Sequence, residues 1–248
     1  QNKSANGIQQ LHYNTFTNNI LYSKFLFDAR VLTKEQISYM KLLATLLGDL
    51  NTENYSFGEL NTALNTHLGG FSTSLRTDLV DHNDENLLAH FEVSSKVLND
   101  KTGKLFEMAD EILYRSKIDD KERLKTLLTK HQSRLYAMTQ RNGLGMAMNR
   151  LSSYYSNQGK FNELTGGYTY YEFITGLMEN YDEKYEDIVA NLKEVAGLLF
   201  NKSNMKVYVA CDEDDLPQYN EGLKKMAQDM PDQELAVHDW SFEFENKN

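Results

Sequence analysis

The sequence has almost no cysteine and almost no proline. One cysteine, Cys211, and two prolines occur among 248 residues. A single cysteine excludes an internal disulfide, so the fold does not depend on an oxidising compartment. Because proline interrupts regular structure, its scarcity favours long, uninterrupted elements and above all helices.

Positive charge is also scarce, and long apolar runs are absent. The 26 Lys and Arg residues face 36 Asp and Glu residues, which gives a formal net charge of −10. Phosphates and anionic lipids require a basic surface, so we expect neither nucleic acid nor membrane as a partner. No apolar run reaches the roughly 20 residues of a membrane span. With neither an initiator methionine nor a signal pattern at Gln1, we expect a piece of a longer protein in a bacterial cytoplasm or an organelle matrix.

The first part of the chain alternates between predicted strands and helices. The runs Ile8–Tyr13 and Ile20–Phe27 flank a turn-rich segment and predict a β-hairpin. A helix is predicted from Thr33 to Leu50, because Thr33 and Gln36 have the spacing of a capping box. Apolar residues then recur every three or four positions, as on the buried face of a helix.

A second helix and a second hairpin follow. Ser56 and Glu59 repeat the capping-box spacing, and Gly69-Gly70 is a stop signal for that helix. The segments Phe71–Val80 and Leu87–Leu98 then alternate in polarity and predict two antiparallel strands.

The rest of the chain is mostly helical. The predicted helices cover Leu105–Leu113, Asp119–Met138, Tyr168–Met178 and Glu183–Phe200. A strand at Met205–Cys211, a helix from Asp212 to Met230 and a strand-like tail at His238–Phe244 close the chain. This order predicts an α+β fold, with a mixed, mainly antiparallel sheet and helices packed on one face. We expect one domain over 1–248, made of hairpins and helices (7–98), a helical block (99–202) and a closing strand-helix-strand unit (203–248).

Histidine and glutamate come close to metal-binding patterns at two places. His82-Asn83-Asp84-Glu85-Asn86 differs from the inverted zinc motif His-x-x-Glu-His by its last residue, and it falls in a predicted turn. His90 and Glu92 share one face of a predicted strand, but no third ligand is in sight. Both patterns are better explained as solvated polar segments.

Four further candidates have structural explanations. His131 lies on an apolar stripe and is interpreted as a packed histidine. Cys211 ends a buried strand with no Cys–His pairing apparent, which indicates an inert thiol. Asp212-Glu213-Asp214-Asp215 suits a helix start better than a cation loop. Gly143-x-Gly145 follows a helix instead of a strand, which excludes a dinucleotide loop. The residues alone therefore indicate no catalytic or metal-binding site, and the substrate-binding residues stay unknown.

Several runs resemble the presequence-protease branch of the pitrilysin/insulinase zinc metallopeptidases. These runs are FLFDARVLTKEQISYMKLLATLLGDLNTENYSFGELNTALNTHLGGFSTSL from Phe25, RNGLGMAMNRLSSYYS, ELTGGYTYYEFITGL and LLFNKSNMKVYVACDED. Together they span most of the chain, and their order is more specific than any single run. The resemblance implies a metallopeptidase homology domain with a helical insertion, of the non-catalytic third-domain type.

The resemblance also implies a role within a larger enzyme. Family members have four similar domains in two halves, which close around a chamber that takes unfolded peptides. The first domain holds zinc on His-x-x-Glu-His. At the corresponding helix of this chain the motif positions fall near Leu42, Thr45 and Leu46, if Asn51-Thr52 takes the family's Gly-Thr place. These residues bind no zinc, so we expect no cofactor in this chain and zinc in the parent's first domain.

Three hypotheses follow. In the first, the chain is a non-catalytic domain of a zinc endopeptidase that degrades peptides, forms part of the chamber wall, and packs against the catalytic half and a fourth domain. In the second, the parent is an inactive homologue that serves as a structural or peptide-binding subunit. In the third, the chain is a free-standing enzyme that uses His131 or the face of His90 and Glu92.

Overall fold

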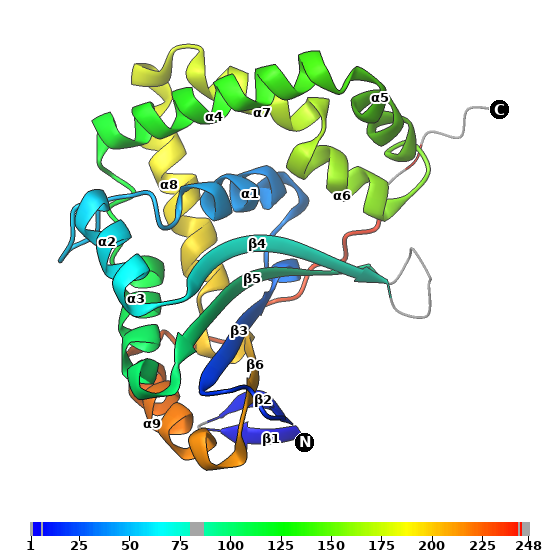
Figure 1. The fold of residues 1–248 in the computed structure, drawn as a ribbon. Helices are drawn as coiled ribbons and strands as arrows, with labels where there is room; N and C mark the ends of the chain where they lie inside the picture. The colour runs from blue at the N-terminus through cyan, green and yellow to red at the C-terminus, as the bar shows by residue number, and fades with distance from the viewer. Residues whose placement is uncertain (1, 6, 80–86, 243, 245–248) are drawn as a thin grey trace.

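A six-stranded mixed sheet forms one layer of the molecule (Figure 1). The computed structural model describes residues 2–5, 7–79, 87–242 and 244. The strands are β1 (Asn2–Ala5), β2 (Ile8–Asn14), β3 (Ile20–Asp28), β4 (Gly70–Leu79), β5 (Leu87–Leu98) and β6 (Met205–Cys211). Their order across the sheet is β1-β2-β6-β3-β5-β4.

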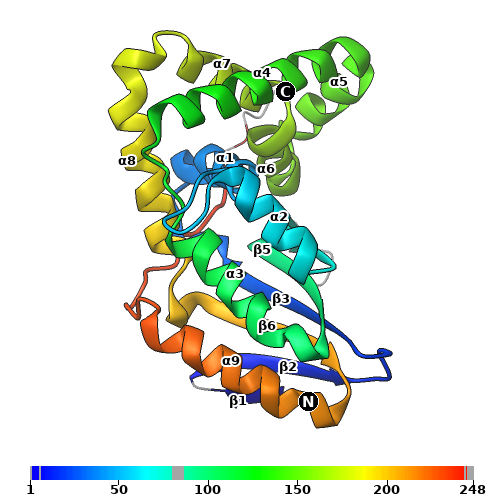
Figure 2. The same cartoon turned by 60° about the vertical axis from the view of Figure 1, so that its left-hand side comes forward.

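Helices form the second layer and a bundle beyond one end of the sheet (Figures 1 and 2). They are α1 (Ile37–Leu46), α2 (Phe57–His67), α3 (Thr102–Tyr114), α4 (Lys121–Arg141), α5 (Gly143–Ser152), α6 (Asn157–Gly166), α7 (Tyr168–Met178), α8 (Tyr181–Leu199) and α9 (Leu216–Asp229). The fold is α+β, as the order of predicted elements indicated.

The predicted first hairpin is wrong, because β6 lies between β2 and β3. β2 pairs parallel with β6, with Gln10 opposite Val207. β3 pairs antiparallel with the other edge of β6, where Phe25 is opposite Val207. The local turn signals were real, since the chain does reverse, but a strand from the far end of the sequence occupies the gap between the two arms.

The predicted second hairpin is confirmed. β4 and β5 pair antiparallel from Gly70 opposite Lys96 to Leu79 opposite Leu87. The segment His82–Asn86, with its near-match to a zinc motif, lies outside the described residues.

Alternation along the strands decides which face of the sheet the helices cover. Phe25 on β3 is buried and lies 6.1 Å from the ring of Phe106 on α3. Phe106 in turn lies 5.0 Å from Tyr219 on α9, so both helices pack on this face (Figure 2). The opposite face exposes Tyr22 and Lys24 on β3, and Lys96 on β5. One buried cluster of side chains extends from Ile8 to Trp240.

Helix ends follow their local signals. Both predicted capping boxes form, at Thr33 with Gln36 and at Ser56 with Glu59. The first turn after Thr33 is a 3-10 helix, and α1 ends at Leu46, earlier than predicted. Gly48 follows with φ of +88°, a left-handed conformation that suits glycine and ends the helix.

The predicted C-terminal strand is wrong for the described residues. Residues 231–242 form no strand, although Trp240 is buried as its apolar pattern suggested. The Trp240 ring stacks on Phe161 of α6, and its Nε1 donates to the Leu32 carbonyl over 2.8 Å. The tail therefore crosses loops and helices instead of joining an edge of the sheet.

Candidate functional sites

Helix α1, where the resemblance locates the family's zinc motif, is packed on several sides. Leu42 and Leu46 are almost completely buried. Ser38 donates to the Leu164 carbonyl of α6 over 2.9 Å, and Thr73 of β4 donates to the Ala44 carbonyl over 2.7 Å. Among the described residues, no group of three or more His, Cys, Asp or Glu side chains could hold a metal ion. The helix has the packing of a core element.

His131 on α4 is a partly buried histidine with a tyrosine partner. Its Nε2 lies 3.1 Å from the hydroxyl of Tyr170 on α7. Burial, together with the positive charges of Lys41 and Arg134, lowers the pKa of His131 to about 4. The ring is therefore neutral near neutral pH, and it joins α4 to α7. This geometry agrees with the interpretation of His131 as a packed residue.

Protonation of His131 is expected to weaken the fold in mild acid. The pKa of His131 is about 4 in the folded chain and 6.5 ordinarily. Between these values the unfolded chain binds a proton that the folded chain does not, so stability is complete above about pH 6.5 and is lost as the pH falls towards 4. We expect the urea midpoint to drop between about pH 7 and about pH 5. His131→Gln should reduce this drop, with His67→Gln as the matched control, and an unchanged drop would contradict the assignment.

His90 and Glu92 share the open face of the sheet, but the carboxylate is already occupied. Glu92 accepts hydrogen bonds from Lys24 over 2.9 Å and from Ser94 over 2.7 Å. Although burial raises it, these hydrogen bonds hold the pKa of the Glu92 carboxyl below its usual value. Burial lowers the pKa of His90, which lies opposite Asp28 in the sheet. The two residues do not form a metal pair, because the Glu92 oxygens serve Lys24 and Ser94.

A Cys–His contact that the sequence did not reveal joins β6 to β2. Cys211 Sγ lies 3.7 Å from His12 Nε2, which also lies 3.1 Å from the Cys211 carbonyl oxygen. Burial, with the nearby charges of Asp215 and Asp212, raises the pKa of the Cys211 thiol to about 11. A nucleophilic cysteine needs a lowered pKa, so this contact does not activate the thiol.

Cys211 is expected to be almost unreactive in the folded protein. Its side chain is fully buried and its thiol stays protonated near neutral pH. We expect a thiol reagent such as DTNB to react at least about a hundredfold more slowly with the native chain than with the urea-unfolded chain. Rapid reaction of the native chain would revive the nucleophile hypothesis. Reaction of unfolded Cys211→Ser would reveal a background unrelated to this residue.

The remaining candidates are helix-end structures. Glu213–Asp215 form a 3-10 turn that leads into α9, with Pro217 in its first turn. Gly143 and Gly145 begin α5 directly after α4, and Asn142 caps this start by accepting a hydrogen bond from the Gly145 amide over 3.2 Å. Both observations agree with the helix-start interpretations.

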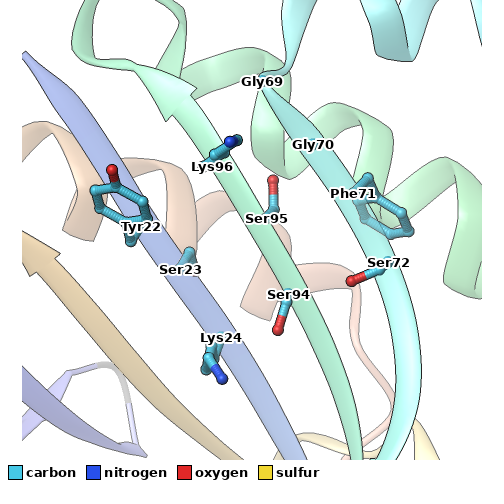
Figure 3. Close-up of a pocket in the computed structure, with 10 residues that line it drawn as sticks. All are labelled: Tyr22, Ser23, Lys24, Gly69, Gly70, Phe71, Ser72, Ser94, Ser95 and Lys96. Atoms are coloured by element: carbon cyan, nitrogen blue, oxygen red, sulfur yellow. The ribbon is translucent and has the colours of Figure 1, made fainter.

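A shallow hollow of about 380 Å³ opens at the sheet beside the start of β4 (Figure 3). Its lining comes from Tyr22, Ser23 and Lys24 of β3, Gly69, Gly70, Phe71 and Ser72 at β4, and Ser94, Ser95 and Lys96 of β5. Backbone, hydroxyl and ammonium groups suit the binding of polar main-chain groups. The lining has no histidine, carboxylate or thiol for acid–base or nucleophilic chemistry.

Comparison with known proteins supports the resemblance. A family model described as peptidase M16 associated, subfamily C, matches residues 1–177. A protein named HypA from Clostridium perfringens is 30% identical over all of this chain, which covers 25% of that relative. Presequence protease 1 of Arabidopsis thaliana, a chloroplastic and mitochondrial protein, is 26% identical over 92% of this chain, which covers 21% of it. The chain thus spans about a quarter or less of these relatives.

Two solved structures share the fold. A conserved protein from Enterococcus faecalis has a TM-score of 0.64 at 16% identity, over 95% of this chain and 53% of that one. A peptidase M16 inactive domain from Pseudomonas fluorescens has a TM-score of 0.64 at 13% identity, over 96% and 52% respectively. None of the helices in the described part of the chain is long and apolar enough to cross a membrane.

Proposed function

Because the chain belongs to the family associated with subfamily C of the M16 peptidases and has the fold of an M16 inactive domain, we propose that it forms part of the wall of a closed peptide chamber. It is a non-catalytic M16 domain, and the parent would be a zinc-dependent endopeptidase that degrades peptides. Unfolded peptides are the proposed substrates. The catalytic half and a fourth domain of the same polypeptide are the proposed partners, in a bacterial cytoplasm or an organelle matrix.

The observation that carries the proposal is the composition of α1. The family resemblance aligns Leu42, Thr45 and Leu46 with the zinc motif of a catalytic sister domain. In this chain two of the three are core leucines, and Thr45 donates to the Lys41 carbonyl of its own helix over 3.0 Å. An apolar helix retained in this position fits a domain that serves the shape of the chamber, with zinc held in the parent's first domain.

The open face of the sheet is the proposed wall surface. Lys96 and Tyr22 are exposed there, near the backbone of Gly70 and Ser72 (Figure 3). Extended peptides present carbonyl and amide groups at regular intervals, and hydroxyl and ammonium groups can pair with the carbonyls regardless of sequence. We also propose that 1–248 acts as one domain, since its buried cluster reaches from the first strands to the C-terminal tail.

Two measurements on the full-length polypeptide test this function. The purified protein should bind zinc and cleave unfolded peptides, and both properties should be lost when the upstream His-x-x-Glu-His is altered. The 248-residue chain alone should bind no stoichiometric zinc. Stoichiometric zinc in this chain, or cleavage of peptides by it, would contradict the proposal and favour a free-standing enzyme.

The wall itself is tested by a bulky substitution. Ser72→Trp on the open sheet face should raise KM for peptides, whereas Thr126→Trp on an exposed position of α4 should leave KM unchanged. Equal KM values for the two variants would count against the wall assignment. A degraded zinc motif in the parent would favour the alternative, a structural or peptide-binding subunit of an inactive homologue.

A further inference from the structure

The stretch from Arg123 to Asn162 differs in charge from the rest of the chain. It contains seven Lys and Arg residues and no Asp or Glu. Its net charge is +7, which leaves −17 on all other residues because the whole chain carries −10. A local basic segment on an acidic protein directs association towards acidic partners.

Part of this positive charge has no internal partner. Arg150 pairs with Glu163 and Lys125 pairs with Asp182. By contrast, four basic side chains have no carboxylate within ion-pair distance among the described residues: Lys130, Arg134, Arg141 and Lys160. Arg141, an exposed residue, immediately precedes α5.

The same segment exposes large apolar side chains. Leu144, Met148 and Leu151 have the spacing of one face of α5, and they are 77%, 62% and 60% exposed. Tyr136, Tyr154, Tyr155 and Tyr168 add exposed aromatic rings around this helix. Seven of the thirteen exposed large hydrophobic residues in the described chain thus fall between 136 and 168. A patch of this kind marks an interaction site.

We propose that this surface, the α5 patch, docks against an acidic protein surface carried by the rest of a longer polypeptide. The inference rests on the proposed function, because it requires this chain to be one domain of that polypeptide. Protein interfaces are enriched in Tyr, Met and Arg, which are the residue types gathered here. The chain covers 25% of one relative and 21% of another, so most of the polypeptide in those proteins lies outside it.

The position of α5 in the fold suits this role. The helix lies at the end of the helical bundle, away from β1 and β2 in both views (Figures 1 and 2). Its inner face is anchored, since Met146 is buried, and Asn149 donates to Glu163 of α6 over 3.1 Å. The exposed face is therefore presented on a fixed helix, which limits the entropy that docking costs.

Thiol labelling of the full-length polypeptide tests the docking. Met148→Cys places a thiol in the α5 patch, and Thr62→Cys on α2 is the matched exposed control. We expect maleimide to react with the thiol of Met148→Cys at least about tenfold more slowly than with that of Thr62→Cys. Arg141→Glu, or about 0.5 M NaCl, should narrow the difference because both weaken charge attraction. The native thiol of Cys211 is buried and contributes little background.

Three results would overturn the proposal. Equal labelling rates at the two positions would show that nothing covers the patch. Protection of Met148→Cys in the 248-residue chain alone, increasing with concentration, would assign the patch to a second copy. Binding of this chain to anionic phosphatidylserine vesicles, lost in Leu144→Ser, would assign it to a membrane. Peptide cleavage is measured in parallel: cleavage without protection rejects the docking alone, and protection without cleavage rejects the proposed function alone.

Discussion

Trp240→Ala is expected to lower the free energy of unfolding by about 3–5 kcal/mol, the range for removing a large buried aromatic side chain. Trp240 is only 4% exposed and stacks on Phe161 with 5.9 Å between ring centroids. The variant also leaves the Leu32 carbonyl without the Nε1 donor. Urea unfolding followed by far-UV circular dichroism measures the loss.

Two further variants separate the causes of this loss. Trp240→Phe keeps a ring on Phe161 and loses only the hydrogen bond to Leu32, so it should cost about 1–2 kcal/mol. Val237→Ala in the same tail changes a side chain that is 60% exposed. It should stay within about 0.5 kcal/mol of the unaltered chain. If Trp240→Ala costs no more than Val237→Ala, the C-terminal tail does not stabilise the fold.

Local patterns predicted the elements better than their partners. The capping boxes at Thr33 and Ser56, and helix α7 from Tyr168 to Met178, depend on residues close together in sequence, and all three are confirmed. The first hairpin failed because β6, from the other end of the chain, pairs between β2 and β3. The tail failed because alternation reports burial, and Trp240 is buried without being in a strand.

The candidate site shows the same limit. His131 could be interpreted from its apolar stripe alone, and Tyr170 then fills the expected partner position. The contact between Cys211 and His12 could not be anticipated, because it requires β2 and β6 to pair across 199 positions of sequence. Nor could occupation of Glu92 by Lys24, since that depends on the register of β3 against β5.

Glu163→Ala is expected to loosen the corner that joins α5, α6 and α7, at a cost of about 2–3 kcal/mol. Its carboxylate is 1% exposed. It accepts hydrogen bonds from Arg150 over 3.2 Å, from Asn149 over 3.1 Å and from the Thr169 amide over 2.9 Å. The cost lies below that of a fully buried ion pair because Arg150 is 45% exposed and can be hydrated once the carboxylate is gone.

The expected loss can be checked in two independent ways. Glu163→Gln keeps an acceptor for Thr169 and should cost about 1 kcal/mol, whereas Glu186→Ala on the exposed side of α8 should cost less than about 0.5 kcal/mol. In a double-mutant cycle, Arg150→Ala should cost less in the Glu163→Ala background than in the unaltered chain. Additive costs would show that the two side chains do not interact.

The position of Glu163 gives this corner a wider meaning. Gly167 follows it closely, and a Cβ there would collide with the Glu163 carboxylate, so the pair fixes the turn from α6 into α7. Both residues lie in the run ELTGGYTYYEFITGL, one of the runs that carry the family resemblance. Because Glu163 also holds Asn149 and Arg150 of α5, its loss should increase amide hydrogen exchange across residues 143–152. Unchanged exchange in Glu163→Ala would show that α5 is held by its buried Met146 alone, and would remove the link between this corner and the α5 patch.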